Sequence, residues 1–140
     1  MLDAISGFAP ALDLTLRDLQ AKLKDKGYPW EIAKSFDGAC VLAPFVPGDA
    51  VEDLSDIGIR LTINGEVRQD GNSRDMLNPI LPMIQHIAGH FSLQPGDVIS
   101  TGTPPGVGMG QKPPVYLRAG QTMRLGIDGL GIQTQTTVQA

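Results

Sequence analysis

The residues most suggestive of chemistry form a glycine-rich segment, Val98–Gly110, which reads VISTGTPPGVGMG. A Walker-type phosphate loop needs a lysine and a hydroxyl residue directly after its last glycine, but here the chain continues as QKPP. A dinucleotide-binding loop must open a helix, which the prolines oppose. Phosphate binding is therefore disfavoured. Two interpretations stay open: a tight structural loop, or a loop whose amides and Thr101 or Thr103 hydroxyl bind another anion or an oxyanion.

Asp13 is a second candidate, because it ends an apolar strand in the segment ALDLTLRDLQ. A carboxylate in that place is costly unless it pairs with a cation or binds a metal ion. Arg17 and Gln20 follow four and seven residues later, so they share one face with it along a helix that begins near Thr15. A helix cap or an ion-pair partner is the commoner role of such a residue, and both roles stay open.

Lys34 lies among apolar residues in PWEIAKSFD. A desolvated lysine can carry catalysis, although a lysine whose ammonium reaches water past its apolar neighbours is commoner.

His86 and His90 are four residues apart, which is a metal-binding spacing on a helix. Both project near the polar face of that helix, and no Glu, Cys or third His accompanies them. We therefore predict that they face solvent.

The composition of the chain limits its number of domains and its class of protein. The 140 residues are 41% hydrophobic and 19% charged, which is typical of one globular domain, and we assign residues 1–140 to it. The net charge of −4 and the lack of a basic run argue against nucleic-acid binding. No apolar run approaches the ~20 residues of a membrane helix, and no secretory leader is visible. We expect a cytoplasmic protein with Cys40 as a buried thiol.

Short strands should dominate the fold, since 17 glycines and 11 prolines favour turns. Residues 5–16 are predicted as a strand disturbed at Pro10, and residues 98–101 as a strand that enters the glycine-rich loop. Asn64-Gly65 predicts a two-residue hairpin turn, and a second pair of strands is expected around Asp128-Gly129.

Two helices are predicted. The first runs from Thr15, as N-cap, to Gly27, and the second lies within residues 73–91, where Pro79 and Pro82 fit only the first turn. Residues 28–47 are expected to be irregular. The predicted class is mixed α/β, mainly β.

Five segments in order resemble the fumarylacetoacetate hydrolase superfamily, and within it the acylpyruvate (fumarylpyruvate) hydrolase branch. They are ALDLTLRDLQ, PWEIAKSFD, INGEVRQDGNSRDM, LQPGDVISTGTPPGVG and GQTMRLGIDGLG. The resemblance implies a β-roll of mixed sheets, a homodimer, and a central divalent cation, Mg²⁺ or alternatively Mn²⁺ or Ca²⁺. Members hydrolyse a C–C bond in 1,3-dicarbonyl acids, as in aromatic catabolism, or decarboxylate, isomerise or cleave related 2-oxo acids.

The resemblance also implies roles for individual residues. Asp13 matches a carboxylate metal ligand of the family. The implied catalytic residues are Lys34, Gln20 and Thr103. The implied substrate-binding residues are Arg17, Gln20, Gly102 and Thr103.

One part of the family pattern is absent from the sequence. Two further metal-binding glutamates are expected upstream as Glu-x-Glu, but the only glutamates here are Glu31, Glu52 and Glu66, all far apart. A His/Glu pair that activates water in the hydrolase branch is also missing. We therefore expect the C-terminal part of the domain, with an incomplete site. The open alternatives are a metal-dependent acylpyruvate hydrolase, an oxaloacetate decarboxylase or 2-hydroxymuconate-type isomerase or decarboxylase, and a non-catalytic fragment or structural subunit.

Overall fold

The computed structural model describes residues 4–139 and confirms a mixed α/β, mainly β class. Its strands are β1 (Gly7–Phe8), β2 (Ala11–Asp13), β3 (Cys40–Leu42), β4 (Val46–Pro47), β5 (Gly58–Ile63), β6 (Glu66–Asn72), β7 (Thr122–Ile127) and β8 (Gly131–Thr136). Its α-helices are α1 (Arg17–Asp25), α2 (Glu31–Lys34) and α3 (Ile80–Ala88), and short 3₁₀ turns include η3 (Ser73–Asp75) and η4 (Gly108–Gly110). No helix in this range is long and apolar enough to cross a membrane.

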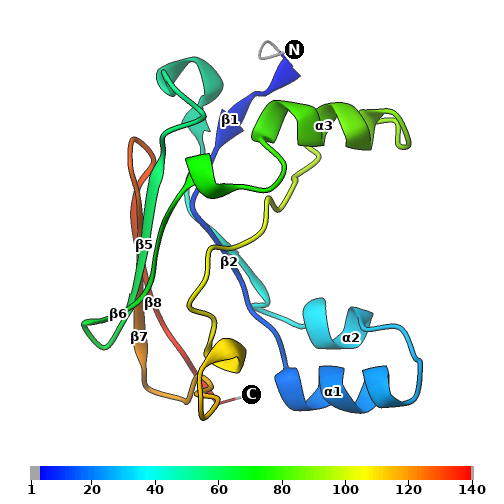
Figure 1. Ribbon diagram of the computed structural model, residues 1–140, viewed down its shortest axis with the longest axis vertical. Coiled ribbons are helices and arrows are strands. Elements are labelled where there is room, and N and C mark those ends of the chain that lie inside the picture. Colours follow the sequence, from blue (N-terminus) through cyan, green and yellow to red (C-terminus); the bar gives the residue numbers. More distant parts are fainter. Residues whose placement is uncertain (1–3, 140) are drawn as a thin grey trace.

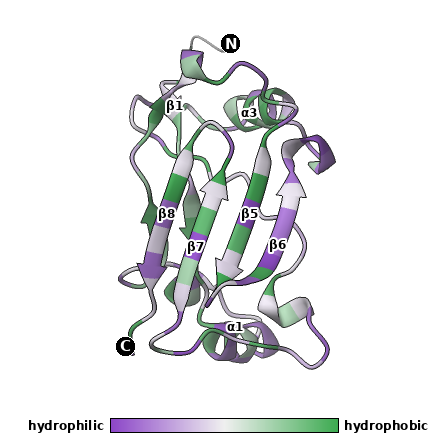
Figure 2. Cartoon of the chain, turned by 90° about the vertical axis from the view of Figure 1, so that its left-hand side faces the viewer, coloured by the Kyte–Doolittle hydropathy of each residue, from purple (hydrophilic) through white to green (hydrophobic). Residues whose placement is uncertain are grey.

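The longest strands form one antiparallel sheet in the order β6-β5-β7-β8, while β1 pairs with β4 and β2 with β3. In Figure 1 this sheet stands on the left, β2 crosses beside it, and the three helices lie on the far side of β2. Figure 2 shows the four long strands side by side, seen on the face turned away from the helices. The β2–β3 ribbon is therefore a middle layer between the sheet and the helices.

The core lies between the large sheet and the β2–β3 ribbon. Leu61, Met123 and Leu125 point inward from the sheet and pack with Leu12 from β2, all less than a tenth exposed. Each such buried side chain contributes roughly 1.5–3 kcal/mol. Because side chains alternate along a strand, Arg60 of β5 and Arg124 of β7 are exposed on the outer face.

One polar side chain interrupts this apolar layer. Gln133 of β8 faces Leu125 across the sheet and is only 7% exposed. Neither atom of its amide group has a hydrogen-bond partner within residues 4–139. Such an unpaired buried group costs about 1–3 kcal/mol.

The predicted hairpin turn is confirmed. Asn64 and Gly65 both have positive φ, 50° and 85°, as a type I′ turn requires. The side chain of Asn64 also accepts a hydrogen bond from the backbone of Thr122, which ties this turn to β7. Further along, Leu61 pairs with Gln69 but Thr62 pairs with Val67, so Arg68 is the extra residue of a β-bulge in β6.

Several local predictions were wrong. Thr15 does not cap α1, which follows Leu16, and the cap position uses no side chain. A third helix, α2, forms where irregular chain was expected, because four residues are too short to show helical periodicity. The second predicted helix is shorter, with 3₁₀ turn η3 at its start and α3 beginning at Ile80. Residues 98–101 form no strand, since no other strand pairs with them.

Candidate functional site

The clearest cluster of polar side chains joins Asp13, Thr15 and Lys34. The Lys34 Nζ lies 2.7 Å from Asp13 Oδ1 and donates a hydrogen bond to Thr15 Oγ1 at 2.9 Å. Leu12 is buried in the core while Asp13 is exposed, so the carboxylate lies on the face of β2 that is turned away from the sheet. The ion pair is one of the two interpretations that the sequence left open for Asp13.

Helix α2 brings Lys34 to this position. Its neighbour Ala33 is fully buried, and the Ala33 carbonyl accepts a hydrogen bond from the Leu16 amide at 3.1 Å. Helices α1 and α2 consequently lie side by side in Figure 1. The Lys34 side chain is 33% exposed. Two of its three ammonium hydrogens are engaged, so within residues 4–139 the third is free to meet a ligand.

Arg17 and Gln20 share one face of α1, as the spacing predicted. Arg17 Nη1 donates to Gln20 Oε1 at 2.9 Å and also contacts the sulfur of Met109 at 3.5 Å. Met109 belongs to η4, at the end of the glycine-rich segment, so α1 and this segment meet across 92 residues of sequence. Neither Arg17 nor Gln20 forms a hydrogen bond with Asp13 or Lys34.

The glycine-rich segment descends from α3 past β2 to η4 in Figure 1. It is anchored on β6 through Gln69, whose Nε2 donates to Thr103 Oγ1 and to the Pro104 carbonyl, both at 2.7 Å. Thr103 remains exposed, and Gly102 has a φ of 95°, which favours glycine. The segment is thus a tight structural loop that also presents a hydroxyl group.

Gln69 was not predicted as a site residue. The hairpin turn at Asn64-Gly65 alone would place Arg68 opposite the inward-facing Leu61, and only the β-bulge at Arg68 moves Gln69 to that position. The contact with Thr103, which is 34 residues away, had no signal in the sequence.

The two histidines and the single cysteine lie at exposed positions. His86 and His90 are exposed, as predicted, and their rings lie 4.7 Å apart. The prediction of a buried Cys40 was wrong: Cys40 pairs with Asp13 across the ribbon and is exposed on the same outward face. Within residues 4–139 no group of three or more His, Cys, Asp or Glu side chains could hold a metal ion.

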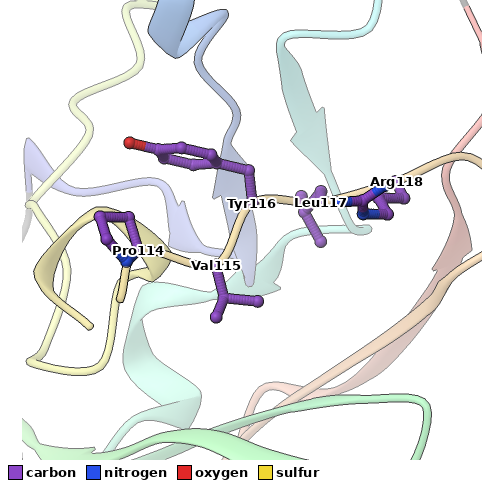
Figure 3. Close-up of a pocket in the computed structure, with 5 residues that line it drawn as sticks. All are labelled: Pro114, Val115, Tyr116, Leu117 and Arg118. Atoms are coloured by element: carbon purple, nitrogen blue, oxygen red, sulfur yellow. The ribbon is translucent and has the colours of Figure 1, made fainter. Parts of the chain in front are cut away.

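Two pockets lie elsewhere. One is lined by the extended run from Pro114 to Arg118, where Val115 and Tyr116 project to opposite sides (Figure 3). The other lies on the outer face of the large sheet, between Arg60 and Arg124. None of the predicted site residues lines either pocket.

Comparison with known proteins identifies the family. The model of the fumarylacetoacetate (FAA) hydrolase C-terminal domain matches residues 1–138. The oxaloacetate tautomerase YcgM of Escherichia coli K12 is 42% identical over 133 residues, which are 94% of this chain and 58% of that protein. The chain therefore belongs to the fumarylacetoacetate hydrolase family.

Solved structures agree in fold. A fumarylpyruvate hydrolase from Pseudomonas aeruginosa, in complex with Mn²⁺ and pyruvate, matches with a TM-score of 0.88 and 33% identity over 99% of this chain and 56% of that one. The fumarylacetoacetate hydrolase of Exiguobacterium antarcticum matches with a TM-score of 0.89 and 36% identity, over 99% and 49%. The chain spans about half the length of the relatives that it matches.

Proposed function

We propose that this chain supplies part of the active site of an enzyme that acts on 2-oxo acids, with hydrolysis of a C–C bond in acylpyruvates and other 1,3-diketo acids as its leading reaction. The observation that carries the proposal is the Lys34 ammonium, which is held by Asp13 and Thr15 with one hydrogen left for a ligand. This cluster sits in a chain of a family whose relatives include the hydrolase with Mn²⁺ and pyruvate.

The chemistry suits these groups. Cleavage of an acylpyruvate develops negative charge on an enolate oxygen, and a fixed ammonium that is only one-third exposed stabilises such charge. The Thr103 hydroxyl is exposed on an anchored loop and can bind an oxygen of the substrate. Arg17 and Gln20 would line the site from α1, and the Gly102 amide would line it from the loop.

The family resemblance adds a divalent cation, Mg²⁺ or alternatively Mn²⁺ or Ca²⁺, with Asp13 as one ligand. Such hard cations take six or more oxygen ligands. The described residues do not form such a site, because they hold no suitable cluster and Asp13 is already paired with Lys34. Any further carboxylate ligands would have to come from outside the described residues 4–139.

A second candidate reaction is keto–enol isomerisation or decarboxylation of oxaloacetate or a related acid. The similarity to the oxaloacetate tautomerase of Escherichia coli favours it. Both candidates pass through an enol or enolate of a 2-oxo acid, so the same Lys34 and Thr103 would serve each of them. We further propose that the working protein is a homodimer. A non-catalytic, structural role is the alternative of another class.

The test is a titration of the purified chain with Mg²⁺ or Mn²⁺ and oxaloacetate or an acylpyruvate. We expect metal binding weaker than millimolar and no turnover by the chain alone. Adding a polypeptide that carries a family Glu-x-Glu strand should restore turnover. The Asp13→Ala variant should abolish that turnover, whereas Asp18→Ala, at an exposed position on α1, should not.

Each outcome decides between the alternatives. Millimolar or tighter metal binding by the chain alone would show that the site is complete. Failure of every complemented assembly to turn over a 2-oxo acid would favour the structural role.

A further inference from the structure

The amide group of Gln69 has a defined orientation at the glycine-rich loop. Its Nε2 lies 2.7 Å from both Thr103 Oγ1 and the Pro104 carbonyl oxygen. A carbonyl oxygen can only accept a hydrogen bond, so the nitrogen of the amide must face Pro104, and the flipped amide would place two acceptors together. Both hydrogens of the NH₂ group are therefore used, one on each partner.

This orientation fixes the role of the Thr103 hydroxyl. Since Gln69 donates, the hydroxyl oxygen accepts, and the hydroxyl proton must point elsewhere. Within residues 4–139 no protein acceptor forms a hydrogen bond with that proton. Thr103 is exposed, so its proton is open to a ligand.

The backbone of β6 holds the loop directly after Thr103. Gly71 packs under Pro104, where an added Cβ would lie 2.7 Å from the proline side chain. A Cβ on Gly106 would come within 1.9 Å of the Arg68 carbonyl oxygen, so the loop backbone lies directly on the bulge of β6. The Arg68 side chain then reaches Gln111, beyond the loop, at 3.3 Å. Thr103 therefore sits in a segment with little freedom to turn.

We infer that Gln69 is a positioning residue that directs the Thr103 hydroxyl proton toward the ligand. The ligand atom that meets this proton must be an acceptor, such as a carboxylate or carbonyl oxygen. The choice of a 2-oxo acid as that ligand rests on the proposed function, whereas the orientation of Thr103 does not.

The first experiment needs no ligand. The side-chain amide signals of Gln69 are assigned in a ¹H–¹⁵N spectrum by their loss in Gln69→Met. We expect both protons to exchange slowly with solvent. In Thr103→Val one of the two should shift and exchange faster, while Thr103→Ser, which keeps the hydroxyl, should leave both unchanged. If Thr103→Val moves neither proton, the inference is overturned.

The second experiment uses pyruvate as the probe and follows the Thr103 backbone amide, with the chain alone and with the complementing polypeptide and Mg²⁺. Loss of one hydrogen bond should weaken pyruvate binding about tenfold in Gln69→Met and in Thr103→Val. Their double variant should be no worse than either single variant, because both remove the same contact. Additive losses would show that Gln69 does not act through Thr103.

Gln69→Glu separates orientation from packing. Its ionised carboxylate would accept from Thr103 and turn the hydroxyl proton away from the ligand, so pyruvate should bind weakly at pH 7. Near pH 4.5 the introduced carboxyl is partly protonated, can donate again, and should recover part of the affinity. A loss that does not change with pH would mean that Gln69 merely fills space.

The two proposals can fail separately. If wild-type protein never responds to pyruvate but the Gln69 amide protons respond to Thr103→Val as expected, the proposed function fails and the positioning role stands. The reverse result would remove only the positioning role.

Discussion

The Lys34 ammonium lies 2.7 Å from the Asp13 carboxylate, so the proposed charge-stabilising group and the proposed metal ligand neutralise each other in this chain. Any cation that binds the Asp13 carboxylate is repelled by the Lys34 ammonium at its Oδ1 atom. The two side chains are therefore coupled, and changing one should alter what the other can do.

Replacing Lys34 with Met tests that coupling. Without the ammonium, Asp13 has no competing partner, so divalent-metal affinity in a complemented assembly should rise while turnover falls. The fold should survive with a stability change within about 1 kcal/mol, because partly exposed ion pairs contribute little. Calorimetric titration with Mn²⁺, thermal unfolding and steady-state rates measure the three effects. Turnover equal to wild type would remove Lys34 from the mechanism.

Gly106→Ala should displace the glycine-rich loop. Gly106 has a φ of 111°, and an added Cβ would lie 1.9 Å from the Arg68 carbonyl oxygen. Gly96→Ala, in the turn before the glycine-rich segment, is the control, since its φ of 96° also lies in the region that favours glycine but nothing lies within 4 Å of an added Cβ. Hydrogen exchange should accelerate in residues 101–110 only in Gly106→Ala. Equal exchange in both variants would contradict the close packing on β6.

Gln133→Met should stabilise the protein. The Gln133 amide is buried without a hydrogen-bond partner in the described part of the chain, and methionine has a similar length and no polar group to desolvate. We expect the free energy of unfolding to rise by about 1 kcal/mol, measured by urea denaturation, with Gln135→Met on the same strand for comparison. A loss of stability would reveal a partner for this amide.

Acid should weaken the structure around Asp56. Hydrogen bonds from Arg74 and then Asn72 lower the pKa of Asp56 below its ordinary 3.8. The folded protein therefore favours the ionised form. Its contribution is complete above the ordinary pKa and is lost as the pH falls through the lowered pKa. Melting temperatures from pH 7 to pH 3 should fall less steeply in Asp56→Asn than in wild type, starting from a lower value at pH 7. Parallel curves would rule out this contribution.

Local chemistry made much of the fold predictable. Asn64-Gly65 determines its own turn, and alternating apolar residues then define which faces of β5 and β7 are buried. The break at Pro10 was also anticipated. The strand partners on either side of Pro10 were not predicted. Strand β1 pairs with β4 and β2 pairs with β3, and such pairing depends on contacts between remote segments.

The residues of the candidate site were likewise predictable from the sequence, but their contacts were not. Residue types and spacing singled out Asp13, Lys34 and Thr103 as chemically interesting. The partners of these residues could not be predicted: Thr15 was expected to cap a helix but instead accepts a hydrogen bond from Lys34, 19 residues away. A four-residue helix with no periodic signal creates that contact.

Because the glycine-rich loop is anchored on β6, its conformational entropy is lost at an earlier step than ligand binding. Fixing the backbone of one residue costs about 1–2 kcal/mol of conformational entropy, and glycines lose the most. Because Gly106 and Pro104 already rest against β6, that loss is incurred as the chain folds and not when a ligand arrives. Ligand binding to the glycine-rich segment should then be fast. Ordering of the protein should contribute only a small unfavourable entropy to that binding.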